Sequence, residues 1–75
     1  MTSEFIGYSA LLEGEVVEIQ MFEEKPYSLV FRKWLKKEDA PGYFLLGLGE
    51  DGRQRILNDS FIEKINGVAF ISLNH

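Results

Sequence analysis

The chain contains no cysteine, which excludes disulfide bridges and thiolate metal sites. Its one histidine is His75, the last of the 75 residues, where chain ends fray, so a histidine-based general base or nucleophile relay is not expected. The carboxylates match no calcium-loop spacing, and Gly47-Leu48-Gly49 is followed by a turn rather than by the helix of a phosphate loop. The sequence therefore predicts a protein that is not an enzyme and that has neither a metal site nor a cofactor.

Long apolar runs are also absent. No stretch approaches the roughly 20 residues that a membrane span requires, and segment 1–5 lacks the basic region of a signal peptide. We therefore expect a cytoplasmic protein without a membrane partner. Basic charge is scarce too: eight Lys and Arg against twelve Asp and Glu give a net charge of −4. This balance disfavours nucleic acid as a partner without excluding it.

Apolar side chains, in contrast, are abundant for a single domain, residues 1–75. Hydrophobic residues make up 45% of the sequence and aromatic residues 13%. A chain of this size is close to the lower limit at which a core is stable without disulfides or metal, and large aromatic rings partly offset the small volume. We expect hydrophobic burial, helped by self-association, to hold the fold.

Acidic and basic residues are segregated along the chain. Residues 1–24 carry six acids and no base, whereas residues 25–37 carry five bases and no acid. The two segments are predicted to pair as a hairpin with its turn at Glu24-Lys25, which places Glu18 opposite Arg32 and favours pairing of opposite charges. The acidic segment also leaves open the hypothesis of an acidic inhibitor that blocks a basic partner.

Hydrophobic alternation and turn residues predict five strands. Asp51-Gly52 between two apolar runs is typical of a tight hairpin turn, and the run 27–35 is apolar on both faces. The predicted strands comprise residues 17–22, 27–35, 43–50, 53–57 and 68–73.

Two segments remain ambiguous in the sequence. The N-terminal segment 3–13 is either a short helix, capped by Thr2 or Ser3, or an additional strand. Segment 61–65 is either a single helical turn or a bent strand.

A small antiparallel sheet with exposed edges tends to aggregate, and closure into a barrel removes those edges. Gly47 and Gly49 stand on one face of a predicted strand, where glycine either relieves crowding at a bend or lets another group approach closely. The short connections favour neighbouring strands. The predicted fold is therefore mostly β: a five-stranded antiparallel meander that closes into a barrel.

The order of elements resembles that of a known group of folds. A first strand within 11–19, three further strands, a short turn and a last strand resemble the small barrels of the SH3-like and Sm-like kind. Segments 42–47, 53–57 and 61–65 are similar to the WYL-type barrel, a ligand-sensing domain of bacterial regulators. In that family an aromatic-aromatic-leucine strand precedes an arginine-bearing strand and a short apolar motif.

This resemblance implies that Tyr43, Arg53 and Arg55 lie near a ligand or nucleic-acid site. The chain departs from the WYL motif at Phe61, where that motif places an arginine. It also lacks the aspartate-to-asparagine loop with which Sm proteins hold a base.

Trp34 stands among basic residues, where it could stack on a base or a cation or could pack on the core. The candidate site for nucleic acid or a small anionic ligand comprises Arg32, Lys33, Trp34, Tyr43, Arg53 and Arg55. Aromatic side chains are enriched at protein interfaces, so a second candidate surface comprises Phe22, Tyr27 and Trp34.

The predicted function is that of a non-catalytic binding module which associates with itself or with a protein partner. A strand that is apolar on both faces needs cover for its second face, and a homo-oligomer or a partner supplies such cover. Binding of nucleic acid or a small anionic ligand is the alternative.

Overall fold

The computed structural model describes residues 5–71 of the chain, and within that range it contains seven strands and two 3₁₀ turns. Their bounds are β1 (Phe5–Ile6), η1 (Tyr8–Ala10), β2 (Val16–Met21), β3 (Tyr27–Lys36), β4 (Tyr43–Gly49), β5 (Gln54–Asn58), η2 (Asp59–Phe61), β6 (Ile62–Ile65) and β7 (Val68–Phe70).

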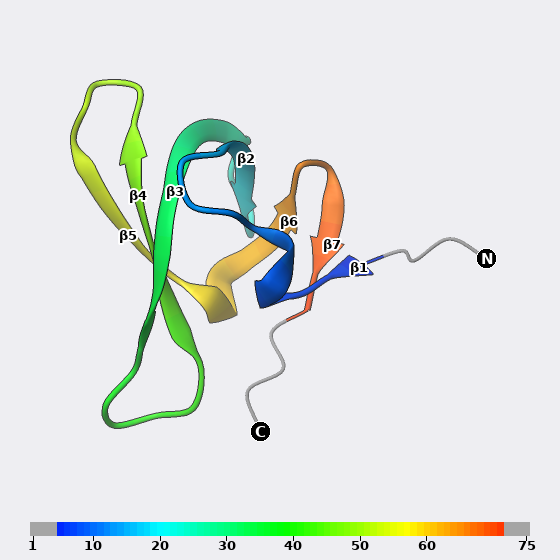
Figure 1. The fold of residues 1–75 in the computed structure, drawn as a ribbon. Helices are drawn as coiled ribbons and strands as arrows, with labels where there is room; N and C mark the ends of the chain where they lie inside the picture. Colours follow the sequence, from blue (N-terminus) through cyan, green and yellow to red (C-terminus); the bar gives the residue numbers. More distant parts are fainter. Residues whose placement is uncertain (1–4, 72–75) are drawn as a thin grey trace.

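All the strands form one sheet in the order β1-β7-β6-β2-β3-β4-β5. The short β1 pairs in parallel with β7, and every other pairing is antiparallel. The sheet is strongly bent, with the β4–β5 hairpin on one side and the β6–β7 hairpin on the other (Figure 1). The predicted mostly β fold is thus confirmed.

The predicted five-stranded meander that closes into a barrel is wrong in two respects. The sheet has six antiparallel strands, because segment 62–65 is extended and forms a hairpin with β7 through Asn66 and Gly67, both at positive φ. The sheet also stays open. After β5, the turn η2 redirects the chain to β6, which pairs with β2, and β5 keeps β4 as its one strand neighbour within residues 5–71.

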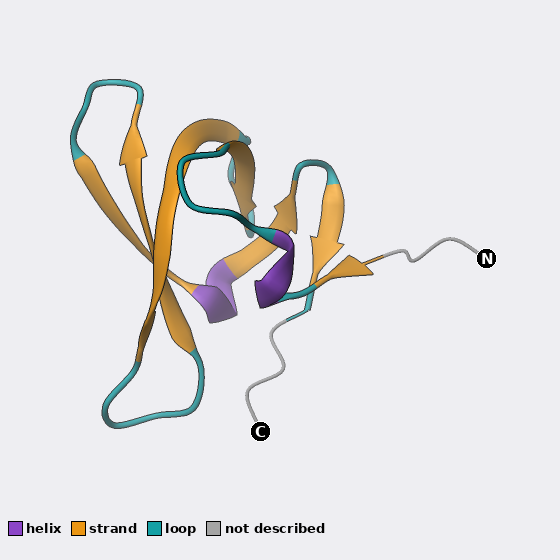
Figure 2. Ribbon diagram, viewed as in Figure 1, coloured by secondary structure: helices purple, strands orange, loops and turns teal. Residues whose placement is uncertain are grey.

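The N-terminal segment is neither a regular helix nor a full strand. Ile6 ends the two-residue β1, and Gly7 leads into η1, where the Ala10 amide donates to the Gly7 carbonyl. The predicted caps at Thr2 and Ser3 lie outside the described residues, as does His75. Figure 2 shows the two 3₁₀ turns beside each other between the hairpins.

The hairpin of β2 and β3 has a different register from the predicted one. Its turn is centred on Glu23, which has a φ of 63°, rather than on Glu24-Lys25. Glu18 therefore lies opposite Ser28 instead of Arg32. Arg32 is the unpaired residue of a bulge in β3, and its Nη2 is 3.9 Å from Glu13 Oε2, an exposed pairing that contributes little to stability.

The core lies on the inner face of the bent sheet, because alternate strand residues point to that side. β2 and β3 each contribute two alternate residues whose side chains point inward. The curvature of the sheet places β6 and β7 over these side chains. The buried hydrophobic side chains are Leu11, Val17, Ile19, Leu29, Phe31, Leu45, Ile62, Ile65 and Phe70.

Gly47 permits the close approach of β3 and β4. A Cβ atom there would lie 2.6 Å from Leu29 Cδ1 and 2.9 Å from the Val30 carbonyl oxygen. A Cβ atom at Gly49 would lie 3.1 Å from Arg55 Nε and 3.1 Å from Asp51 Oδ1, which belong to flexible side chains. Crowding at a bend thus accounts for glycine at position 47.

We predict that Gly47→Ala lowers the free energy of unfolding by about 1–3 kcal/mol, because the added methyl group meets a buried side chain and backbone. Gly49→Ala is the matched control on the same face of β4, and it should lower the free energy of unfolding by a clearly smaller amount. Urea unfolding followed by circular dichroism measures both. Equal losses for the two variants would contradict the close packing at position 47.

Candidate functional site

Trp34 belongs to an internal aromatic cluster. Its ring stacks on Phe70 with centroids 5.7 Å apart and an interplanar angle of 14°, and it meets the Tyr8 ring edge-on at 4.7 Å. Its Nε1–H donates to the Tyr8 carbonyl at 3.0 Å. The Tyr43 ring also contacts the Tyr8 ring, at 4.9 Å between centroids. Trp34 and Tyr43 therefore serve packing in this structure.

The predicted basic residues do not form one surface. Lys33 lies opposite Leu46, which in turn lies opposite Ile56, whereas Arg55 lies opposite Gly47. Adjacent strand residues point to opposite faces, so Lys33 and Arg55 are on opposite faces of the sheet.

The two predicted arginines of the hairpin, Arg53 and Arg55, both lie near the carboxylate of Asp51. Asp51 lies 3.2 Å from Arg55 Nη2 and 3.9 Å from Arg53 Nε. The structure thus gathers part of the predicted set, Arg53 and Arg55, around a carboxylate. It leaves Arg32 and Lys33 exposed elsewhere on β3.

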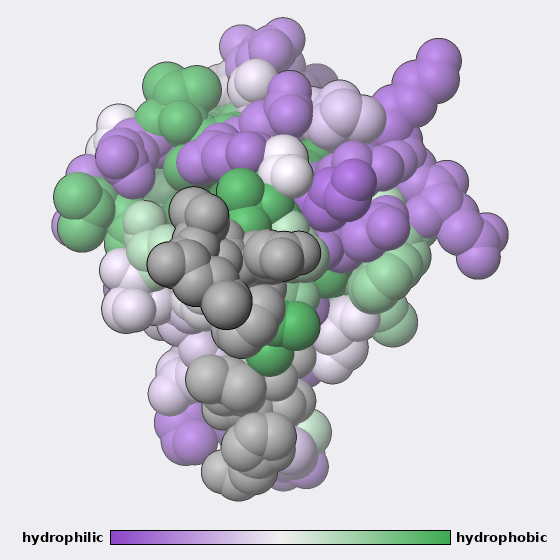
Figure 3. Space-filling model, turned by 90° about the vertical axis from the view of Figure 1, so that its right-hand side faces the viewer, coloured by the Kyte–Doolittle hydropathy of each residue, from purple (hydrophilic) through white to green (hydrophobic). Residues whose placement is uncertain are grey.

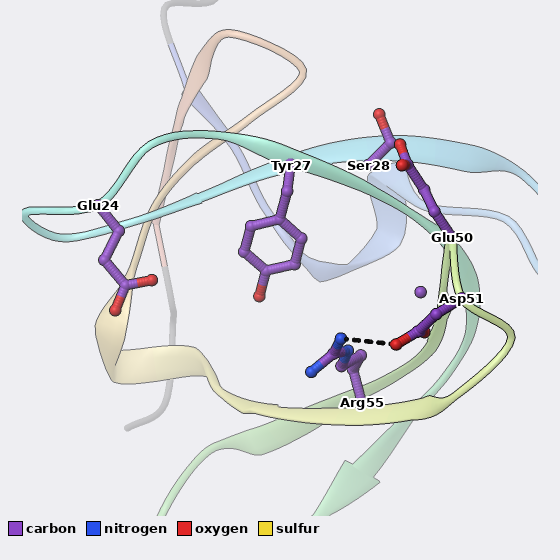
Figure 4. A pocket seen from close by; sticks show the side chains of 7 residues that line it. Glu24, Tyr27, Ser28, Glu50, Asp51 and Arg55 are labelled. Carbon is purple, nitrogen blue, oxygen red and sulfur yellow. Dashed lines mark hydrogen bonds and ion pairs between the residues drawn. The ribbon is translucent and has the colours of Figure 1, made fainter.

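A pocket of about 520 Å³ opens between β3 and the β4–β5 hairpin (Figure 4). Tyr27 and Arg55 point toward each other across it, from β3 and β5 respectively, and Asp51 holds the guanidinium from the hairpin turn. The lining residues are Glu24, Tyr27, Ser28, Gly49, Glu50, Asp51 and Arg55. One member of each predicted set, Tyr27 and Arg55, therefore meets here.

The charges of this pocket oppose binding of an anion. Its walls carry three carboxylates, from Glu24, Glu50 and Asp51, against the one guanidinium of Arg55. Burial, reinforced by the nearby Glu24 carboxylate and opposed by Arg55, raises the pKa of the Tyr27 hydroxyl above its ordinary value. The pocket does not therefore provide the positive potential that a phosphate or an anionic ligand requires.

Asp59 is the centre of a polar network that the sequence did not reveal. The residue is only 1% exposed. Its carboxylate accepts hydrogen bonds from the Tyr8 hydroxyl, from Lys37 Nζ at 2.9 Å and from the Tyr43 amide at 2.9 Å. Lys37 Nζ also donates to Asn58 Oδ1 at 2.8 Å.

The ionised form of Asp59 is the stable one in the fold. Burial by itself raises the pKa of this carboxyl, but the hydrogen bonds from Tyr8, Lys37 and the Tyr43 amide, together with the charge of Lys37, outweigh burial. The pKa of Asp59 is therefore lowered from its ordinary value. Tyr8, Lys37 and Tyr43 come from different parts of the sequence, which is why local sequence patterns gave no signal for the network.

The outer face of the sheet carries a row of apolar side chains over β3, β4 and β5, together with the polar Lys33 and Gln54, and no described element covers it. Side chains that alternate with the core positions lie there: Val30 opposite Leu48, and Leu46 opposite Ile56. Val30, Leu46 and Leu48 are half-buried by their neighbours, whereas Ile56 is 58% exposed. The predicted second apolar face of segment 27–35 is thus present and uncovered within residues 5–71.

The side of the molecule that carries β1 and β7 has no comparable row of apolar side chains among the described residues that are visible there (Figure 3). Where described residues are visible on the side that carries β1 and β7, hydrophobic surface forms small patches between hydrophilic side chains (Figure 3). The exposed Phe22 and Phe61 are backbone neighbours, since the Phe22 amide donates to the Phe61 carbonyl at 2.9 Å. Of the predicted interface trio, Phe22 is therefore exposed, Tyr27 lines the pocket and Trp34 is packed.

β5 is an edge strand with little protection. It pairs with β4 without a bulge, from Phe44 opposite Asn58 to Leu48 opposite Gln54. It contains no proline and no lysine, which are the residues that usually block an edge. Its outer side chain Ile56 is exposed.

Comparisons of the chain with protein-family models, curated proteins and solved structures found no match. Within residues 5–71, no three acidic, histidine or cysteine side chains gather as a metal site. No helix in that range has the length and apolar character needed to cross a membrane. The functional interpretation therefore depends on the surfaces described above.

We predict that Asp59→Asn lowers the free energy of unfolding by about 3–5 kcal/mol, because it leaves the ammonium of Lys37 buried without a counter-charge. Urea unfolding measures the loss, and Asp51→Asn, which removes an exposed carboxylate, is the control with a small expected effect. Adding Lys37→Met to Asp59→Asn should recover part of the loss. No recovery would contradict a direct interaction between the two charges.

The same network predicts a pH dependence of stability. Because the pKa of Asp59 is lowered in the fold, its contribution is present above the ordinary carboxyl value of about 3.9 and is lost as the pH falls through the folded-state pKa. Unfolding free energies measured from neutral pH into this acid range should fall less steeply for Asp59→Asn than for the wild type. Parallel curves would contradict the lowered pKa.

Proposed function

We propose that this chain is a non-catalytic interaction module that acts by associating with a second copy of itself. The observation that carries the proposal is the unprotected edge of β5, flanked by the uncovered apolar outer face of β3–β5. An unpaired row of backbone donors and acceptors next to exposed apolar side chains favours the addition of another strand.

A second copy fits this surface better than a charged ligand does. The apolar side chains around Ile56 gain by burial against like side chains, and a symmetric contact brings the same patch from both molecules. By contrast, Trp34 is occupied by Phe70 and Tyr8, and Arg55 is paired with Asp51. These contacts weigh against the alternative of a nucleic-acid or anion site.

The element order supports a relationship to the SH3-like and Sm-like folds at the level of strand succession. A strand, three further strands, a short turn and a last strand correspond to β2, β3–β5, η2 and β7, with β6 inserted between η2 and β7. The additional strands β1 and β6 and the open β5 edge are features of this chain.

We predict that the protein changes from a monomer of 8.6 kDa to a dimer of twice that mass as its concentration rises. Burial of apolar surface and backbone pairing drive this association, so it should depend only weakly on salt. Sedimentation equilibrium over a wide concentration range, at low and high salt, measures both properties.

A monomer at every concentration would contradict the proposed function. Titration with labelled single-stranded RNA and DNA at two salt concentrations is the companion measurement. Binding at low salt that weakens steeply as salt rises would instead support the nucleic-acid alternative.

A further inference from the structure

We infer that the two copies pair antiparallel through β5, about a two-fold axis that passes beside Ile56. This inference rests on the proposed self-association and specifies its geometry. It follows from the directions of the backbone groups of β5, from the position of its charges and from the face on which Ile56 lies.

The β4–β5 ladder determines which backbone groups of β5 face outward. The Gly49 amide donates to the Arg53 carbonyl at 2.8 Å, so Arg53 directs its carbonyl toward β4. Residues of an antiparallel ladder alternate between pairs that exchange hydrogen bonds and pairs that do not. With no bulge in β5, the backbone groups of Arg55 and Leu57 also face β4. Those of Gln54, Ile56 and Asn58 face the open edge.

Continuous pairing of two β5 edges requires outward groups to oppose outward groups. This condition restricts the two-fold axis to positions beside Arg55, Ile56 or Leu57. With the axis at Ile56, Ile56 lies opposite Ile56 of the second copy, and Gln54 lies opposite Asn58 of the second copy. Every outward backbone group of β5 then has a partner. An axis at Arg55 leaves Asn58 unpaired, and an axis at Leu57 opposes Gln54 to Ser60, which lies in the 3₁₀ turn η2.

Charge also distinguishes the axis at Ile56 from the axis at Arg55. An axis at Arg55 would set two guanidinium groups directly opposite each other, and like charges in that position destabilise a sheet. An axis at Ile56 places Arg55 opposite Leu57 of the second copy instead. The guanidinium then keeps its bond to Asp51, at 3.2 Å, while its aliphatic stem lies along the leucine.

The Ile56 axis also joins the two apolar outer faces. Directly opposed residues point to the same side of a sheet, so the two Ile56 side chains meet on the outer face beside Leu46 of each copy. Exposed surface of Ile56, 58% of its maximum, is thereby covered. One strand-to-strand contact is smaller than a standard interface of about 1,600 Å², so the association is expected to be weak and concentration-dependent.

Ile56→Lys is the first test, because it places two ammonium groups opposite each other at the axis. We expect it to raise the dissociation constant by about tenfold or more in sedimentation equilibrium. Val16→Lys is the matched control: Val16 is an exposed aliphatic residue of the same sheet, at 69%, but it lies on the interior strand β2. That variant should dimerise like the wild type. Circular dichroism establishes that both variants keep the fold.

Disulfide trapping is the second test and reports the register directly. The chain has no cysteine, so each introduced thiol reports one position. Opposed residues that exchange hydrogen bonds have Cα atoms about 5.5 Å apart, within the range of about 4.4–6.8 Å for a disulfide. Under mild oxidation Ile56→Cys should form a covalent dimer, whereas Gln54→Cys and Val16→Cys should stay monomeric on non-reducing gels.

The outcomes separate the register from the proposed function. Association that withstands Ile56→Lys, or a covalent product from mixed Gln54→Cys and Ile56→Cys with none from Ile56→Cys alone, overturns the Ile56 axis while self-association stands. Species larger than a dimer also overturn it, because a two-fold edge contact closes at two copies. Failure of the wild type to associate at any concentration overturns both proposals.

Discussion

The fold depends on the burial of one carboxylate. Asp59 in η2 accepts hydrogen bonds from Tyr8 in η1, from Lys37 after β3 and from the Tyr43 amide at the start of β4. These segments meet where the chain leaves one hairpin and enters the other. A buried charge is tolerated only when its partners are in place, so the hydrogen bond from Tyr8 to Asp59 ties the position of the N-terminal segment to the path from β5 to β6.

Local chemistry accounts for the parts of the fold that the sequence predicted. Apolar runs and turn residues placed strands at 27–35 and 43–50, close to the observed β3 and β4, and Asp51-Gly52 marks the observed hairpin turn. The incorrect predictions concern how strands pair with one another. The positive φ of Glu23 shifted the β2–β3 register, and pairing of β6 with β2 excluded a simple meander. Neither can be inferred from neighbouring residues alone.

The candidate site shows the same division between local and distant information. Sequence proximity grouped Trp34 with its basic neighbours, but folding packs the indole between Tyr8 and Phe70, residues far away along the chain. The apolar character of both faces of β3, in contrast, follows from its own residues and was predicted. The exposed edge of β5 was not predicted. Closure of the sheet depends on which strand β6 pairs with after the turn η2, and β6 pairs with β2.

Asn58 links this edge to the interior. It is the last residue of β5, and its side chain accepts from Lys37 Nζ at 2.8 Å and from the Ser60 amide at 2.9 Å. A strand that docks along β5 would therefore restrain the residue that helps to position the lysine of the buried pair. Docking and internal order are then thermodynamically linked, and each favours the other by the same free energy. A strand bound at the β5 edge would therefore stabilise the position of the N-terminal segment.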